Sequence, residues 1–191
     1  MRLADALAIR LDGREAIDAR LNGVQVWPAN MPPIRRRFGN EARGPHSFGT
    51  SNGRCVVARF TLPEAARDLV LYHFLRLNFA GACSMRGVVL QSAGGEPGAL
   101  VMVSDPQVVP ATPDWVAAPL PEPLPVGTYY IGAVCSSDAR VMEASDAPVG
   151  SPGATRLATD FNFANPPVVW PGSPGSYVSV LSCFVEYTPQ A

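Results

Sequence analysis

The chain has 191 residues, of which 47% are hydrophobic and 16% are charged, and its formal net charge at pH 7 is −1. These values favour one globular domain with a small addition, and they exclude a wholly disordered chain, which would carry more charge and less apolar surface. Because the chain has no excess of cations, we expect no nucleic-acid partner. No stretch supplies the roughly 18 apolar residues of a membrane-spanning helix, so we expect no membrane insertion.

The first element is a segment with two hairpin signals. Asp12-Gly13 and Asn22-Gly23 are dipeptides preferred in type I′ turns, which need positive φ at both central residues. Two such turns predict a three-stranded meander within residues 1–28. Apolar residues alternate along its strands, so one face needs a cover, because so small a sheet is not stable alone.

Residues 6–28 read ALAIRLDGREAIDARLNGVQVWP, in which IRLDG is followed by the similar ARLNG. In this form the segment resembles those that open many tail-tip, baseplate and fibre-like proteins of tailed bacteriophages and prophages. The resemblance implies a docking module that packs on another virion protein. The candidate docking residues in this segment are Ile9, Leu11, Ile17, Leu21, Val26 and Trp27. The alternative for Trp27 is that it closes the small sheet against the following domain.

Residues 29–54 are rich in Pro, Gly and Arg and show no periodicity, which predicts an extended linker. Arg35, Arg36 and Arg37 within it are further candidate docking residues, because three adjacent cations suit an acidic partner surface. The alternative is a solvated charged face.

From residue 55 to residue 191, apolar segments of strand length recur between Gly and Pro residues. The predicted strands are 55–62, 69–79, 84–93, 99–104, 114–120, 127–136, 139–144 and 176–188. Many short strands of this kind predict an antiparallel β-sandwich. The Pro-rich stretch 106–125 is expected at an edge, because Pro cannot donate to a central ladder.

Three pieces of this region occur in a fixed order. They are the FTLP segment at 60–63, the GGEPGAL segment at 94–100, and Trp115 followed by LPVGTYYIG at 124–132. In this order they resemble the jelly-roll modules of phage tail and bacterial surface proteins. The resemblance spans residues 55–187 and implies a jelly-roll-like sandwich, which says more about the fold than about a ligand.

Residues 146–175 depart from that pattern and predict a long loop, and long loops are often functional. The candidate ligand-binding residues are Phe161, Phe163 and Trp170 within it, because exposed aromatic faces suit sugar rings or protein partners. The alternative is that these aromatic side chains lie under the loop and seal the end of the sandwich.

Metal and cofactor motifs are not found in the sequence. The four cysteines, Cys55, Cys83, Cys135 and Cys183, form no CxxC pair, and the chain has two histidines, so we expect no metal site. We expect Cys135 and Cys183, which lie in apolar runs, to be buried thiols, and the alternative is a disulfide between Cys55 and Cys183. No phosphate-binding glycine loop is present, and we expect no cofactor.

No catalytic residue is assigned. His46 and His73 lie outside any nucleophile motif, so we expect the protein not to be an enzyme. The alternative is a glycan-cleaving tail enzyme that uses paired carboxylates. The acidic residues gathered late in the chain are Asp138, Glu143, Asp146 and Asp160.

The order of anchor, linker and sandwich predicts a non-enzymatic structural protein of a phage virion. We expect it to be made in the host bacterial cytoplasm, to dock on other tail or baseplate proteins, and to present the sandwich to host-surface glycan. The alternative is a head decoration, collar or spacer protein with a purely structural role. A trimer is expected by analogy with fibre-like appendages.

Overall fold

The computed structural model describes residues 10–11, 14–15, 20–21, 24–25, 34–42, 46–50, 52–77, 82–137, 140–146, 155–172, 175–177 and 179–190. The chain divides into two units, Met1–Pro33 and Ile34–Ala191, which are taken one at a time below. Every regular element in these residues is a β-strand, and none is a helix that could span a membrane. The all-β prediction is confirmed.

Two short hairpins make up the described part of the N-terminal unit. β1 (Arg10–Leu11) pairs with β2 (Arg14–Glu15), and β3 (Arg20–Leu21) pairs with β4 (Val24–Gln25). Each register leaves a two-residue connection at the dipeptide that the sequence predicts. β2 and β3 both lie between the two turns, on the segment predicted as the middle strand, and residues 16–19 between them are outside the described residues, so the three-stranded meander stays a prediction.

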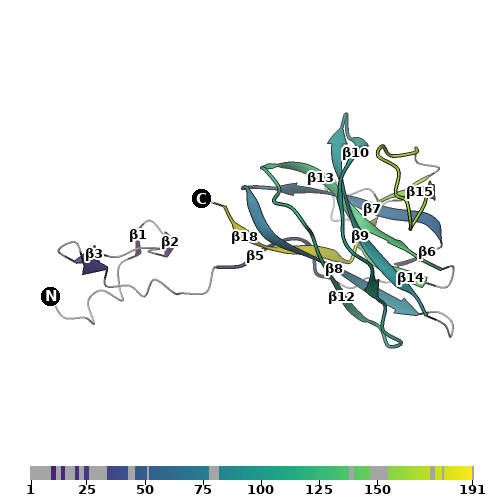
Figure 1. The fold of residues 1–191 in the computed structure, drawn as a ribbon, viewed down its shortest axis with the longest axis horizontal. Helices are drawn as coiled ribbons and strands as arrows, with labels where there is room; N and C mark the ends of the chain where they lie inside the picture. The colour runs from purple at the N-terminus through teal and green to yellow at the C-terminus, as the bar shows by residue number, and fades with distance from the viewer. Residues whose placement is uncertain are drawn as a thin grey trace. The chain divides into compact units, whose positions relative to one another are not determined.

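The second unit is a sandwich of two antiparallel sheets (Figure 1). The first sheet has the order β10 (Glu96–Val103), β9 (Ser84–Ala93), β13 (Gly127–Cys135), β7 (Gly53–Leu62), β15 (Thr155–Phe161) and β16 (Gly175–Tyr177), and β11 (Gln107–Val108) also pairs with β9. The second sheet has the order β17 (Ser179–Leu181), β14 (Arg140–Asp146), β8 (Ala66–Leu77), β18 (Cys183–Pro189) and β5 (Arg36–Asn40), while β12 (Asp114–Pro119) pairs with β8 and β6 (His46–Thr50) pairs with β14.

The main core lies between the two sheets and is built by alternation. Tyr129, Ile131 and Ala133 of β13 all enter it, as their spacing predicts, and Leu71 and Leu75 of β8 enter it from the other sheet. Each of these side chains is at most 6% exposed. The sandwich prediction is therefore confirmed, whereas the jelly-roll form of it stays a prediction.

The first sheet is also apolar on its outer face. A second cluster of buried side chains lies there, formed by Cys55, Val57, Val88, Leu90, Tyr130, Val134, Ala158, Phe161 and Trp170. As a result β13 is buried continuously from Tyr129 to Cys135. A strand buried on both faces shows an unbroken apolar run in place of alternation, which is the pattern of IGAVC in this strand.

Two predicted irregular regions contain strands. β5 and β6 lie within the predicted linker 29–54, and both belong to the second sheet, so the sandwich unit starts at Ile34. β15 lies within the predicted loop 146–175 and pairs with β7. Its sequence TRLATDF shows no regular alternation because the register shifts between Ala158 and Phe161, which both pack on the outer face although they are three residues apart.

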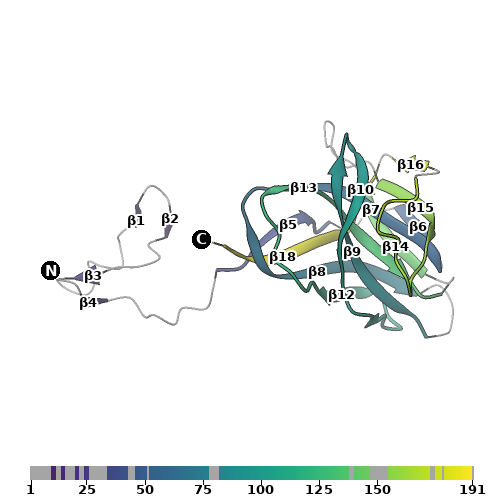
Figure 2. The same cartoon turned by 45° about the horizontal axis from the view of Figure 1, so that its top comes forward.

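The GGEPGAL segment opens with a turn, and the Pro-rich stretch contains an edge strand, as the sequence predicts for that stretch. Gly94 and Gly95, which connect β9 to β10, both have positive φ, as a type I′ turn requires. β12, in the Pro-rich stretch, pairs with β8 alone, and it lies at the margin of the sandwich in Figures 1 and 2. Pro119 ends this strand, where a missing N–H does not interrupt a central ladder.

Candidate functional site

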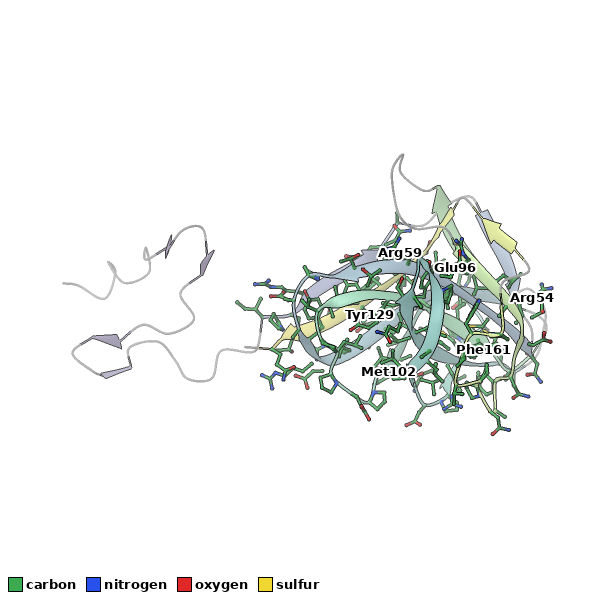
Figure 3. The ribbon with its side chains drawn as sticks, turned by 90° about the horizontal axis from the view of Figure 1, so that it is seen from above. Arg54, Arg59, Glu96, Met102, Tyr129 and Phe161 are labelled. Atoms are coloured by element: carbon green, nitrogen blue, oxygen red, sulfur yellow. The ribbon has the colours of Figure 1, made fainter. Side chains whose placement is uncertain are left out.

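The predicted aromatic ligand-binding residues are covered. Phe161 is 0% exposed and Trp170 is 8% exposed, their ring centroids lie 5.9 Å apart, and Phe163 is half-buried against the same outer cluster. Figure 3 labels Phe161, which lies within the outline of the sandwich. The prediction of an exposed aromatic face is wrong for Phe161 and Trp170, which are buried as in the alternative, whereas the ligand-binding role of the half-buried Phe163 stays a prediction.

The loop that covers them is a strap formed by residues 162–172. It begins at the end of β15 and reaches β10, at the opposite edge of the first sheet. Leu100 N donates to Val168 O at 2.9 Å, and Trp170 N donates to Gly98 O at 3.0 Å. The strap therefore crosses the outer face of the sheet and is held by backbone hydrogen bonds at its far end. This explains why the aromatic side chains it carries point inward.

The three predicted docking arginines are paired with carboxylates of their own chain. Arg35 donates to Glu186 at 3.0 Å, and Arg36 donates to Glu64 at 2.6 Å. Arg37 donates through Nε and Nη2 to Glu186, at 3.1 and 3.0 Å, and through Nη1 to Glu41 at 2.8 Å. The carboxylates lie on β18 and on neighbouring segments of the same unit, and the arginine side chains are 43 to 55% exposed, as in the alternative of a solvated charged face. Their docking role stays a prediction.

These ion pairs shift the pKa values of Glu186 and Arg37. Hydrogen bonds from Arg35 and then Arg37 hold the pKa of the Glu186 carboxyl below its ordinary value. The hydrogen bond to Glu186 raises the pKa of Arg37, and the bond to Glu41 adds to this effect. Glu186 and Arg37 therefore each favour their charged form more than an isolated side chain of their kind does.

The remaining predicted docking residues belong to the N-terminal segment. Leu11 and Leu21 lie in β1 and β3, whose side chains are outside the described set. Four others lie outside the described residues altogether, namely Ile9, Ile17, Val26 and Trp27. Their docking role stays a prediction.

The outer face of the second sheet carries an aromatic cluster that sequence reasoning missed. Inward alternation of Leu71, His73 and Leu75 along β8 sends Tyr72 and Phe74 to the outer face. Direct cross-strand partners are Phe184 on β18 for Tyr72 and Trp115 on β12 for Phe74. We call these four residues, Tyr72, Phe74, Trp115 and Phe184, the aromatic face.

The rings of the aromatic face form one connected set. Tyr72 and Phe184 are stacked, with centroids 4.8 Å apart and planes 12° apart. Trp115 meets Phe74 at 5.4 Å and Phe184 at 5.0 Å, in both cases edge to face. Phe74 and Phe184 are buried, whereas Tyr72 and Trp115 are half-buried. The indole of Trp115 is thus part of the outer layer and reaches across β8 to a ring two strands away.

Small residues and one guanidinium border the aromatic face. Gly39 on β5 is the cross-strand partner of Phe184, and Ala117 on β12 is the partner of Tyr72. A Cβ at Gly39 would lie 2.6 Å from Phe184 Cα, so glycine lets β5 approach. The guanidinium carbon of Arg37 lies 5.0 Å from the Phe184 ring centroid, within cation–π range.

A polar cluster lies on the outer face of the first sheet. Arg156 donates to both carboxylate oxygens of Glu96, at 2.7 Å each, and the Tyr130 hydroxyl donates to Gly95 O. Arg59 lies opposite Tyr130 on β7, and Figure 3 labels both Arg59 and Glu96. The hydrogen bond from Arg156 lowers the pKa of Glu96. This cluster ties the β9–β10 turn to β15 and acts as a brace.

The described residues offer little for nucleophilic or metal chemistry. His73 is fully buried in the main core, burial lowers its pKa to about 3, and neither ring nitrogen has a hydrogen-bond partner in the described part of the chain. No three His, Cys, Asp or Glu side chains of the described residues gather at one metal-sized site. Asp160 is exposed, and the side chains of the other late acidic residues lie outside the described set.

All four cysteines are buried and free, which confirms the prediction made for Cys135 and Cys183, and the alternative disulfide is wrong. Cys55 lies in the cluster on the outer face of the first sheet, whereas Cys183 lies in the main core between the sheets. Burial raises the pKa of both thiols. A thiol with a raised pKa and no solvent access is inert.

No protein-family model and no curated protein matches this sequence.

Proposed function

We propose that the chain is a non-enzymatic structural protein of a phage virion, at the tail tip or baseplate, which docks through its N-terminal hairpins and presents the sandwich to host-surface glycan. The observation that carries the proposal is the division into a small hairpin unit and a sandwich with a partly exposed aromatic face. Two-stranded hairpins are marginal on their own, so this unit suits a role in which another protein covers it.

The two outer faces of the sandwich differ, and this difference supports the contact role. The outer face of the first sheet is closed by its own strap, whereas Tyr72 and Trp115 on the second sheet are half-buried. Half-exposed aromatic side chains with a polar rim are the composition of binding surfaces. The proposal places host contact on the second sheet and leaves the first sheet as a scaffold.

Assembly tests the docking role. In the full chain, the double substitution Gly13→Val and Gly23→Val puts β-branched residues where both turns need positive φ. We expect purified particles to lack the double variant while they incorporate Gln25→Thr, which keeps both turns. Normal incorporation of the double variant would contradict docking through the hairpins.

A purely structural spacer is the second candidate, and one observation favours it. Val101, Val168 and Val169 are 42%, 78% and 58% exposed, and they lie where the strap meets β10. Exposed aliphatic side chains at one edge suit a protein neighbour. This candidate predicts that the full-length protein does not attach to host cells at any concentration. The contact role predicts saturable attachment.

A further inference from the structure

We propose that the aromatic face binds a neutral saccharide, with Trp115 and Tyr72 packing against sugar rings and the Arg37–Glu186 pair bonding to sugar hydroxyl groups. The inference rests on the proposed function, in which the sandwich contacts host glycan, and it assigns the site and the class of ligand.

The ring geometry is set before any ligand arrives. Phe74 and Phe184 are 2% and 7% exposed, and each holds the indole of Trp115 edge to face. Because the underlying rings are buried, Trp115 loses little conformational freedom when a ligand covers it. A preoriented aromatic ring at the surface suits the C–H face of a pyranose, which is flat and apolar.

The residues around the aromatic face leave Tyr72 and Trp115 partly accessible. Ala117, Tyr72, Phe184 and Gly39 are successive cross-strand partners over β12, β8, β18 and β5. Four strands at a spacing of about 4.8 Å make a row of about 15 Å, which is the length of an oligosaccharide and not of a single sugar. Both ends of the row are small residues, and Arg37 is the long side chain that packs on it, over the Phe184 ring.

A polar group of fixed geometry borders this row. Arg37 packs on the Phe184 ring, and its bonds to Glu186 and Glu41 use three of the five N–H donors of its guanidinium. Glu186 is held in place by Arg35 as well. Alternating N–H donors and carboxylate acceptors next to an apolar surface match a sugar, which carries hydroxyl groups around the rim of an apolar ring face.

The charge balance favours a neutral saccharide. The two cations of this group, Arg35 and Arg37, are matched by the two carboxylates of Glu41 and Glu186. An acidic sugar would have to displace one of these carboxylates from its arginine. Neutral hydroxyl groups can share the same donors and acceptors without breaking an ion pair.

A protein is the competing occupant of the aromatic face. Exposed aliphatic side chains, which suit a protein interface, lie beside β10 at Val101, Val168 and Val169. The aromatic face instead combines rings with a neutralised polar rim, which is why we commit to a saccharide.

The test uses the neutral and acidic fractions of host surface polysaccharide, separated by anion exchange, and the full-length ¹⁵N-labelled protein. The three indole N–H signals, from Trp27, Trp115 and Trp170, are assigned with Trp→Phe variants. We expect the neutral fraction to shift the Trp115 signal in a saturable way and the Trp170 signal to stay unchanged. If neither fraction shifts the Trp115 signal, or the acidic fraction alone does so, the inference is wrong.

A blocking variant gives a second readout that removes no core atoms. Ala117→Gln places a longer neutral side chain next to Tyr72, and Ala99→Gln is its matched control on the exposed side of β10. We expect Ala117→Gln to weaken binding of the neutral fraction at least tenfold and Ala99→Gln to leave it unchanged. Equal binding by the two variants would overturn the assignment of the site.

Attachment of the labelled protein to host cells separates the two proposals. If cells bind the wild type and Ala117→Gln equally, the result agrees with host contact and overturns the saccharide site. Cells that bind neither protein would overturn host contact, and the polysaccharide titration would still decide the saccharide site.

Discussion

Tyr72 and Phe184 are stacked across β8 and β18, with ring centroids 4.8 Å apart and planes inclined by 12°. The stacking follows from the register, in which the two residues are direct cross-strand partners. The same register places Gly39 on the other side of Phe184. The aromatic face is therefore a product of strand pairing between segments that lie far apart in the sequence.

Stability should fall in mild acid because of His73. The folded state keeps His73 neutral, with a pKa of about 3, whereas the unfolded chain takes up a proton near pH 6.5. The contribution of neutral His73 to the free energy of unfolding is therefore complete above pH 6.5, and it is lost as pH falls toward 3. By linkage, the loss between pH 7 and pH 5 is about 2 kcal/mol of unfolding free energy, which urea unfolding at the two pH values measures.

The matched variant for this prediction is His73→Met, which has a similar volume and no titrating group. Neither nitrogen of His73 has a partner in the described part of the chain, so an apolar replacement should be neutral or stabilising at pH 7. We expect its unfolding free energy to change about 2 kcal/mol less than that of the wild type over the same pH interval. An equal change in both proteins would refute the role of His73.

Phe161→Ala should destabilise the sandwich by about 3 to 5 kcal/mol, because the ring is fully buried in the outer cluster beneath the strap. Phe163→Ala, at a half-buried position on the same strap, should cost about 1 kcal/mol. Denaturant unfolding of both variants measures this difference. Similar small costs would mean that the strap does not seal the first sheet.

Gly39→Ala should cost more than Gly172→Ala, although φ is positive at both glycines, at 121° and 106°. A Cβ at Gly39 would lie 2.6 Å from Cys183 O and from Phe184 Cα, whereas nothing lies within 4 Å of a Cβ at Gly172. We expect about 1 kcal/mol for Gly172→Ala from backbone strain alone, and at least about 3 kcal/mol for Gly39→Ala. Thermal unfolding compares the two, and equal shifts in Tm would show that β5 does not approach Phe184 closely.

Glu96→Gln should destabilise the sandwich by about 1 kcal/mol, because it leaves the mostly buried Arg156 guanidinium without its carboxylate. This figure is already reduced for the exposure of Glu96 to solvent. The control is Asp68→Asn, since the Arg67–Asp68 pair is exposed and 3.9 Å apart, and we expect a change below about 0.5 kcal/mol. Urea unfolding at low and high salt measures the stability of both variants. An unfolding free energy of Glu96→Gln equal to that of the wild type would rule out the brace between the β9–β10 turn and β15.

The sequence by itself determined the features that depend on neighbours along the chain. Positive φ at Gly94 and Gly95, the two N-terminal hairpin turns and the inward side of β13 are local consequences of residue type and alternation. Most strands of the sandwich were predictable for the same reason, since their apolar segments have strand length and end at Gly or Pro.

Tertiary structure alone decided which aromatic side chains reach the surface. Phe161 and Trp170 look like ligand residues in the sequence but lie under their own strap, whereas the rings of the aromatic face are brought together by three separate strands. The partners of Arg35 and Arg37 were hidden in the same way, because Glu186 lies about 150 residues further along the chain. Burial and charge pairing depend on which segments pair across a sheet, and the local sequence does not determine which distant segments pair.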